Sequence, residues 1–286
     1  KTPIVLGGIY ASLCYDHAIK NSGADYVIKG KGEIAFLKLA DKLLGIKRNY
    51  ENLPKHIDEY PSPAYHLYSP NPDSVSILSS VGCPYKCSYC ASSSLQDFFQ
   101  QRNPEKVISD IEYYVKKMKI RDITFYDDAI LFNAKKHFEI ILDQILEKKI
   151  HARFHTPNGM HIREITENIA LKMKNAGFTE VQLGFESVSS DIQRRSSSKV
   201  TSEELKEKIK ILINAGYDPM DIGVYVLMGL PDQSIEEIIQ TFIFVHECGG
   251  KIKVSQYSPI PGTVDYERTV KEYGFDTDDP LYHNKS

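Results

Sequence analysis

From residue 74 onward, short apolar runs alternate with amphipathic helical patterns along the chain. The apolar runs predict strands at 74–78, 123–125, 151–156, 181–185, 222–228 and 252–254. Between them, apolar residues recur three and four positions apart, which is the pattern of a helix that covers a sheet. Such strand–helix units in succession form parallel sheets with right-handed crossovers. Because six units are fewer than the eight of a closed barrel, we expect an α/β fold with a partial, TIM-like (β/α)6 barrel.

Capping signals mark the ends of several predicted helices. A cap and a first-turn proline, or a Thr/Ser followed three positions later by Glu, predict helix starts. These signals are Asn103–Pro104, Thr201 with Glu204, and Ser234 with Glu237. Gly177 and Gly216 each follow an Asn-Ala pair and predict helix exits, since glycine adopts the left-handed conformation that ends many helices.

The regions outside the barrel divide into three segments. Residues 1–44 predict a separate βαβα piece, with strands at 4–6 and 26–28 and helices near 11–21 and 33–44. Residues 45–73 hold five of the fourteen prolines, which is typical of a linker or an extended arm. The barrel then occupies 74–262, and 263–286 form a C-terminal extension. Since the chain starts at Lys1 with a strand already under way, we expect a piece of a longer protein.

The charge balance excludes several classes of protein. Lys and Arg total 35 against 38 Asp and Glu, a net charge of −3. A generic polyanion-binding surface is not expected from this balance, and no basic run indicates nucleic acid or anionic lipid. No apolar stretch approaches the roughly 20 residues that a membrane helix needs.

The most informative stretch is Gly82–Cys90, which follows the first predicted barrel strand. It places three of the five cysteines at the spacing CxxxCxxC, as Cys83, Cys87 and Cys90. Thiolates are soft ligands for zinc or iron–sulfur clusters. A structural zinc site normally has four Cys or His ligands, and no histidine lies nearby. Three thiolates suit a four-iron cluster with one iron left to bind a small molecule; zinc and unliganded thiols are the alternatives. Cys14 and Cys248 are expected to be small buried thiols.

With Tyr89 directly before the last cysteine, this stretch resembles the signature of the radical S-adenosylmethionine (SAM) superfamily. The resemblance covers about residues 74–262. It implies a 4Fe–4S cluster on Cys83, Cys87 and Cys90, and SAM on the fourth iron. It also implies an anaerobic enzyme: the reduced cluster cleaves SAM to methionine and a 5′-deoxyadenosyl radical, which abstracts hydrogen from a substrate of unknown identity.

The same resemblance assigns roles to residues at the strand ends. Asp127 and Asp128 lie at the position of the family segment that contacts the amino group of SAM. Glu186 lies at the position of a residue that contacts the ribose. A cation after the fourth strand would meet the SAM carboxylate, with Arg195 chosen over Arg194 and Lys199. Leu227 and Pro259 would pack on adenine.

The alternatives are an acidic turn for Asp127–Asp128, a strand-end carboxylate for Glu186 and a solvated basic turn for Arg194–Arg195. His155 and Asn158 are expected to face substrate or to belong to a polar loop.

Residues 5–11 and 23–33 resemble the second half of the Rossmann-like, cobalamin-binding-type domain found before many radical SAM barrels. The cobalt-ligating DxHxxG motif belongs to the first half of that domain and is absent from this sequence. Cobalamin is therefore possible but unsupported. A cobalamin-dependent radical SAM methyltransferase is the nearest alternative function, and a non-catalytic zinc or iron–sulfur module is a more distant one.

The resemblance also implies partners and a location. A reduced flavodoxin or ferredoxin would supply the electron, because reductive cleavage of SAM needs the low end of the iron–sulfur potential range. Free thiols in a metal-type grouping indicate a cytoplasmic protein rather than one stabilised by disulfides.

Overall fold

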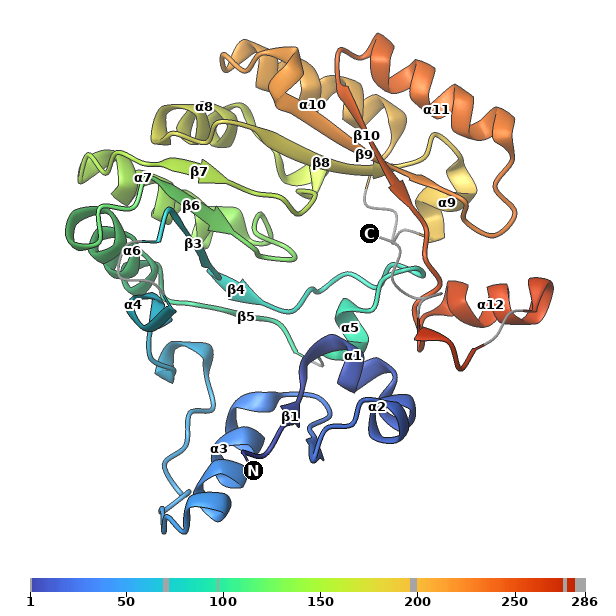
Figure 1. Ribbon diagram of the computed structural model, residues 1–286. Helices are drawn as coiled ribbons and strands as arrows, with labels where there is room; N and C mark the ends of the chain where they lie inside the picture. The colour runs from blue at the N-terminus through green and yellow to red at the C-terminus, as the bar shows by residue number, and fades with distance from the viewer. Residues whose placement is uncertain (1, 69–71, 97, 196–199, 275–276, 281–286) are drawn as a thin grey trace.

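The computed structural model describes residues 2–68, 72–96, 98–195, 200–274 and 277–280, and its centre is a curved barrel of parallel strands with helices outside (Figure 1). The barrel strands are β3 (Ser74–Ile77), β6 (Asp122–Phe125), β7 (Arg153–His155), β8 (Val181–Glu186), β9 (Ile222–Met228) and β10 (Lys251–Gln256). They form two parallel sheets, with the orders β3-β6-β7 and β8-β9-β10.

Two isolated parallel bridges join these sheets into one wall. Phe154 in β7 pairs with Phe178, and Met160 pairs with Leu183 in β8. Within the described part of the chain, β3 and β10 do not pair with each other, so the barrel stays open along that side. The predicted partial barrel of six strands is therefore confirmed.

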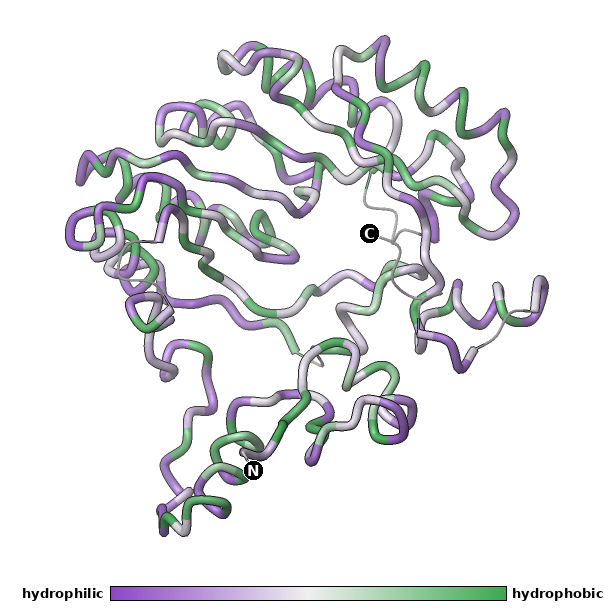
Figure 2. Tube along the Cα trace, in the orientation of Figure 1, coloured by the Kyte–Doolittle hydropathy of each residue, from purple (hydrophilic) through white to green (hydrophobic). Residues whose placement is uncertain are grey.

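The outer layer consists of helices that follow the strands in sequence. They are α6 (Pro104–Glu112), α7 (Phe138–Glu147), α8 (Glu167–Ala176), α9 (Ser190–Arg195), α10 (Ser202–Asn214) and α11 (Ile235–Glu247). Figure 2 shows apolar and polar residues alternating along these helices, as expected for helices with one buried face. None of the described helices is long and apolar enough to cross a bilayer.

The predicted caps lie where the sequence placed them. The Asn103 side chain accepts a hydrogen bond from the Glu105 amide (2.8 Å) at the start of α6. Thr201 and Glu204 form a reciprocal capping box at α10. Gly177 ends α8 with a φ of 102°, in the left-handed region that favours glycine. After β6, a 3-10 turn (Ala134–Lys136) and a break at His137 precede α7.

The apolar core fills the layer between the barrel wall and the outer helices. At its centre, the rings of Phe125, Phe138, Phe154 and Phe178 are each at most 1% exposed and lie 5.3–6.1 Å apart between centroids. Buried residues alternate with more exposed ones along β3 and β6. Since successive side chains of a strand point to opposite faces, the other face lines the barrel interior.

The N-terminal segment (residues 2–44) is a small separate layer below the barrel (Figure 1). It consists of β1 (Val5–Leu6), α1 (Gly8–Leu13), α2 (Tyr15–Asn21), β2 (Tyr26–Val27) and α3 (Gly32–Leu44), with β1 and β2 parallel. The single helix predicted near 11–21 is two helices, because the backbone leaves the helical region at Cys14. α1 contacts α5 (Ser92–Leu95), which follows the three cysteines.

The arm (residues 45–68) runs from this segment along the barrel edge to α4 (Tyr65–Tyr68). Its Tyr65 hydroxyl donates to the carbonyl of Ser76 (2.5 Å) and accepts from the amide of the same residue (2.9 Å). Ser76 lies in β3, whose outer edge has no strand neighbour among the described residues. The arm therefore satisfies backbone groups that an edge strand leaves unpaired.

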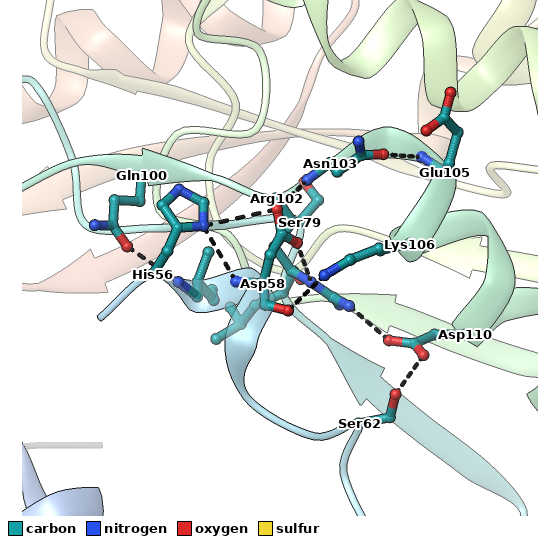
Figure 3. Close-up of polar contacts among 12 residues, drawn as sticks. His56, Asp58, Ser62, Ser79, Gln100, Arg102, Asn103, Glu105, Lys106 and Asp110 are labelled. Carbon is teal, nitrogen blue, oxygen red and sulfur yellow. Dashed lines mark hydrogen bonds and ion pairs between the residues drawn. The ribbon is translucent and has the colours of Figure 1, made fainter. Parts of the chain in front are cut away.

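A network of ion pairs holds the arm against α6, as Figure 3 shows. The Arg102 guanidinium lies 2.8 Å from the Asp110 carboxylate and 3.6 Å from that of Asp58, and all three side chains are at most 16% exposed. Ser62 donates to the other Asp110 oxygen (2.5 Å), while the Asn103 amide donates to Asp58 (2.8 Å). The proline-rich segment is thus a fixed arm.

The structure adds elements that the periodicity did not predict. A short antiparallel pair, β4 (Ser80–Val81) with β5 (Gln100–Gln101), leads into and out of the cysteine loop. α6 continues as a π-helical turn (Tyr113–Lys117), and α12 (Val264–Tyr273) follows β10.

We expect Asp110→Ala to destabilise the protein by about 1–3 kcal/mol, because the largely buried Arg102 guanidinium loses its shortest ion pair and keeps only the longer contacts to Asp58 (3.6 Å) and the Leu78 carbonyl (3.3 Å). The free energy of unfolding in urea measures this, and limited proteolysis should cleave the arm faster. Glu105→Ala removes an exposed carboxylate from the same helix and is the control. Equal losses in the two variants would contradict the assigned role of Asp110.

Candidate functional site

A cavity of about 430 Å³ lies at the carboxyl end of the barrel strands. Its wall combines the loop after β4, the segments after β6 and β7, and the ends of β8, β9 and β10. The lining residues are Cys83, Tyr85, Cys87, Tyr89, Cys90, Ser92, Asp128, Pro157, Asn158, Gly159, Met160, His161, Gly184, Glu186, Tyr225, Leu227 and Ser255. The structure therefore brings together residues from six separate regions of the sequence.

The cysteine loop (residues 82–92) begins at a glycine that no other residue can replace without strain. Gly82 has a φ of 82°, and a Cβ built there would lie 2.1 Å from the carbonyl oxygen of Phe98. Further along, the Cys90 amide donates to the Cys87 carbonyl (3.1 Å), which closes a tight turn. Cys83, Cys87 and Cys90 all face the same cavity.

The donor set fits an iron–sulfur cluster better than a single metal ion. No disulfide bond joins any of the five cysteines, all of which lie in the described part of the chain. Among the described residues, no three His, Cys, Asp or Glu side chains lie close enough together to hold one metal ion. A mononuclear zinc site needs such a compact set. Three soft donors spread over one cavity wall suit a larger group, in which different metal atoms take different thiolates.

Tyr89 and Glu186 connect the cysteine loop to the end of β8. The Tyr89 hydroxyl donates to Glu186 Oε1 at 2.9 Å. Burial, followed by the Glu186 charge, raises the pKa of the Tyr89 hydroxyl well above its usual range, so it stays a donor. Glu186 is 8% exposed and has a φ of 73° at an irregularity in the β8–β9 register. This left-handed backbone turns the carboxylate into the cavity wall.

The adjacent residues Asp127 and Asp128 have different surroundings. Asp128 lines the cavity; burial raises its pKa, and a hydrogen bond from Ser92 opposes that rise. Asp127 is 3% exposed and is not among the lining residues. Its carboxylate accepts hydrogen bonds from the hydroxyls of Ser79 (2.7 Å) and Ser80 (2.6 Å). In this structure the Asp127 carboxylate fixes the chain that enters the cysteine loop, and its expected contact with the amino group of SAM stays a prediction.

Arg195, the expected cation for the SAM carboxylate, also lies away from the cavity lining. Its guanidinium donates to the carboxylate of Asp265 (3.3 Å) in α12. Arg194 pairs with Asp191 on its own helix, and Lys199 lies outside the described residues. Within the part of the chain that the structure describes, neither Arg194 nor Arg195 lines the cavity.

The two expected adenine contacts differ in position. Leu227 lines the cavity and packs with Tyr89 and Tyr257 in a small apolar cluster. Pro259 follows β10, is half-buried and is not among the lining residues. Both adenine contacts stay predictions, with Leu227 on the cavity wall and Pro259 outside it.

The segment after β7 supplies residues that the sequence reasoning missed. Of the two polar residues considered there, Asn158 lines the cavity, whereas His155 hydrogen-bonds Asp122 (2.9 Å) and is not among the lining residues. His161 lines the cavity and stacks on Tyr85 of the cysteine loop, with ring centroids 4.2 Å apart. The sequence offers no periodic signal for this pair, because the residues are 76 positions apart in different loops.

Comparison with known proteins places this geometry in a family. The sequence model of the Radical SAM superfamily matches residues 77–245, which contain the cysteine loop and most of the barrel. The chain belongs to the radical SAM superfamily. Membership implies an enzyme that uses a 4Fe–4S cluster and SAM, as the sequence resemblance predicted, and such enzymes need an electron donor.

Two curated relatives align with nearly the whole chain. An uncharacterized methyltransferase of Pyrococcus horikoshii is 26% identical over 93% of this chain, and the bacteriochlorophyllide d C-12(1)-methyltransferase of Chlorobaculum tepidum is 24% identical over 98%. The radical SAM chain spans 63% of the length of each relative.

Solved structures confirm the fold. The radical SAM methyltransferase TsrM from Kitasatospora setae has a TM-score of 0.75 and 17% identity, covering 94% of this chain and 60% of its own. Coproporphyrinogen III oxidase from Escherichia coli has a TM-score of 0.54 and 14% identity, covering 85% of this chain and 57% of its own. The match to TsrM includes the N-terminal segment as well as the radical SAM barrel, since it covers 94% of the chain.

We expect Tyr89→Phe to cost about 1–3 kcal/mol of stability, because it leaves a buried carboxylate without this donor. Urea unfolding of the metal-free protein measures the loss. Tyr126→Phe removes a hydroxyl from a side chain that is 50% exposed and should change little. An unchanged unfolding free energy for Tyr89→Phe would show that Glu186 does not depend on this hydroxyl.

Proposed function

We propose that the full protein is a radical SAM enzyme in which Cys83, Cys87 and Cys90 hold the 4Fe–4S cluster. The observation that carries the proposal is that the three thiols share one cavity with Asp128 and Glu186. When bound, the reduced cluster supplies the electron that cleaves SAM to methionine and a 5′-deoxyadenosyl radical, which abstracts hydrogen from substrate.

The chain's own residues orient SAM in this proposal. Asp128 lies on the cavity wall, where partial desolvation raises its pKa, and its carboxylate would pair with the SAM ammonium. Glu186, fixed by Tyr89, accepts from the ribose hydroxyls. Leu227 supplies an apolar surface for adenine. Asn158 has its amide nitrogen 3.1 Å from the Tyr126 carbonyl, so it holds the loop after β6 beside these groups.

A reduced flavodoxin or ferredoxin is the electron donor that we propose, because iron–sulfur potentials reach low values and SAM cleavage needs them. We place the protein in the cytoplasm, where reducing conditions keep cysteines from forming disulfides.

A specific observation favours a cobalamin-dependent methyltransferase as the second candidate. A largely apolar cavity of about 650 Å³ lies between α1 and the cysteine loop, with Ile9, Tyr10 and Leu13 on one side. Cys90 and Ser92 line both this cavity and the 430 Å³ cavity. The TsrM structure, which matches 94% of this chain, contains cobalamin and a 4Fe–4S cluster. A cofactor in the larger cavity would thus lie beside the cysteine loop.

The proposed domain division follows the same reasoning. Residues 1–44 would be the second half of a Rossmann-like, cobalamin-binding-type domain, 45–73 the connecting arm, 74–262 the barrel and 263–286 an extension. The N-terminal segment exposes Ile4, Ile9, Phe36 and Leu44 by 53–72%. In this proposal, the first half of such a domain would cover these apolar side chains.

The cluster assignment predicts that Cys87→Ala abolishes iron loading and deoxyadenosine formation while the barrel still folds. After anaerobic reconstitution, the unchanged protein should bind about four irons per chain with matching sulfide. Cys248→Ala, outside the cavity, should load normally. One zinc per chain, or deoxyadenosine production by Cys87→Ala, would contradict the assignment.

The cobalamin candidate predicts that Leu13→Trp, made in the full-length protein, weakens hydroxocobalamin binding at least ~10-fold, since the indole fills the cavity between α1 and the cysteine loop. Visible absorbance titration measures the binding, and iron content should stay unchanged. Ile19→Trp alters a residue that is 53% exposed on α2 and is the control. Full-length protein that binds no cobalamin would remove this candidate and leave the cluster assignment intact.

A further inference from the structure

Ser88, between the second and third cysteines of the loop, has a distinctive set of hydrogen bonds. Its amide donates to the carbonyl of Arg195 at the end of α9 (3.0 Å). Its carbonyl accepts from the Asp265 amide (3.0 Å), and its hydroxyl donates to Asp265 Oδ2 (2.6 Å). All three polar groups of Ser88 are therefore bound by residues from outside the cysteine loop.

Asp265 is itself tightly placed. It is 1% exposed and lies in the first turn of α12, whose start is capped by the side chain of Thr263. Its other carboxylate oxygen, Oδ1, faces guanidinium nitrogens of Arg195 (3.3 Å) and Arg268 (3.5 Å). A buried carboxylate with partners on both oxygens is held in one geometry, because losing any partner exposes it to the cost of desolvation.

Cysteine ligands need comparable precision. Metal sites require their ligating atoms to be held within about 0.5 Å, and residues behind the ligands change metal affinity by roughly 10–100-fold. The Cys87–Cys90 segment is a tight turn with one internal backbone hydrogen bond, from Cys90 to Cys87. Contacts from elsewhere in the fold must therefore supply the rest of its rigidity.

We propose that Asp265 is a positioning residue for the iron–sulfur cluster: it acts through Ser88 to fix the Cys87 and Cys90 thiolates. This inference rests on the proposed function, in which these cysteines hold the cluster. It makes α12, which follows the barrel in sequence, part of the active-site framework. It also gives Arg195 a different role from the one expected: its guanidinium neutralises Asp265, and its carbonyl accepts a hydrogen bond from the Ser88 amide.

The test compares four variants of the protein reconstituted anaerobically with iron and sulfide. Asp265→Ala removes the whole carboxylate, Asp265→Asn keeps an acceptor of the same shape, and Ser88→Ala removes only the hydroxyl. Glu267→Gln changes an exposed carboxylate on the same helix and is the control. The measurements are iron per chain, the rate of iron loss to a chelator, the electron paramagnetic resonance spectrum and midpoint potential of the reduced cluster, and thermal unfolding of the metal-free protein.

We expect Asp265→Ala to lose iron to the chelator about 10–100-fold faster than the unchanged protein, with a broadened resonance spectrum. Asp265→Asn should retain iron nearly normally, with a more positive midpoint potential, because it keeps the hydrogen bond and loses the charge. Ser88→Ala should lie between the two in iron loss. Glu267→Gln should match the unchanged protein in every measurement.

The outcomes separate the inference from the function on which it rests. If neither the unchanged protein nor Glu267→Gln loads about four irons, the proposed function fails. If both load and Asp265→Ala shows the same iron retention, spectrum and potential, the positioning role fails. If Asp265→Ala unfolds, Ser88→Ala tests the positioning role instead, because this variant keeps both backbone hydrogen bonds of residue 88. Unchanged iron loss and an unchanged spectrum in Ser88→Ala would overturn the inference.

Discussion

Buried carboxylates outside the cysteine loop hold that loop in place, and the geometry of the three thiols depends on them. Asp127 binds Ser79 and Ser80 just before the loop, Glu186 binds Tyr89, and Asp265 binds Ser88. A loop of irregular backbone has few internal hydrogen bonds, so its conformation follows from such contacts. A buried carboxylate, in turn, is stable only while its hydrogen bonds are made. Each contact therefore orders both partners.

This constraint explains why neighbouring acidic residues have different roles. Asp127 turns toward the serines of the β3–β4 connection, while Asp128 turns into the cavity. The Asp127 carboxylate accepts hydrogen bonds from serine hydroxyls of the protein, whereas the Asp128 side chain lines the cavity. The same division separates Arg195, which neutralises Asp265, from the groups that line the cavity. Charged residues at the strand ends thus build the framework as well as the site.

The N-terminal segment and the arm add a second level of organisation. Ion pairs among Arg102, Asp58 and Asp110 fix the arm to the barrel, and α1 contacts α5 directly after the cysteine loop. Two cavities consequently meet at Cys90 and Ser92. The N-terminal segment therefore touches the element that directly follows the cysteine loop (Figure 1).

The sequence by itself determined the strand–helix series, the helix caps at Asn103 and Thr201, and the cysteine spacing, because these depend on residues a few positions apart. It could not separate Asp127 from Asp128 or place Arg195, and it gave no sign of His161 or Asp265. The partners of these residues are distant in sequence: Asp127 bonds Ser79 across 48 residues and Asp265 bonds Ser88 across 177. Periodicity and capping report local structure, whereas the burial that makes a carboxylate structural or functional arises only when the folded barrel brings those partners together.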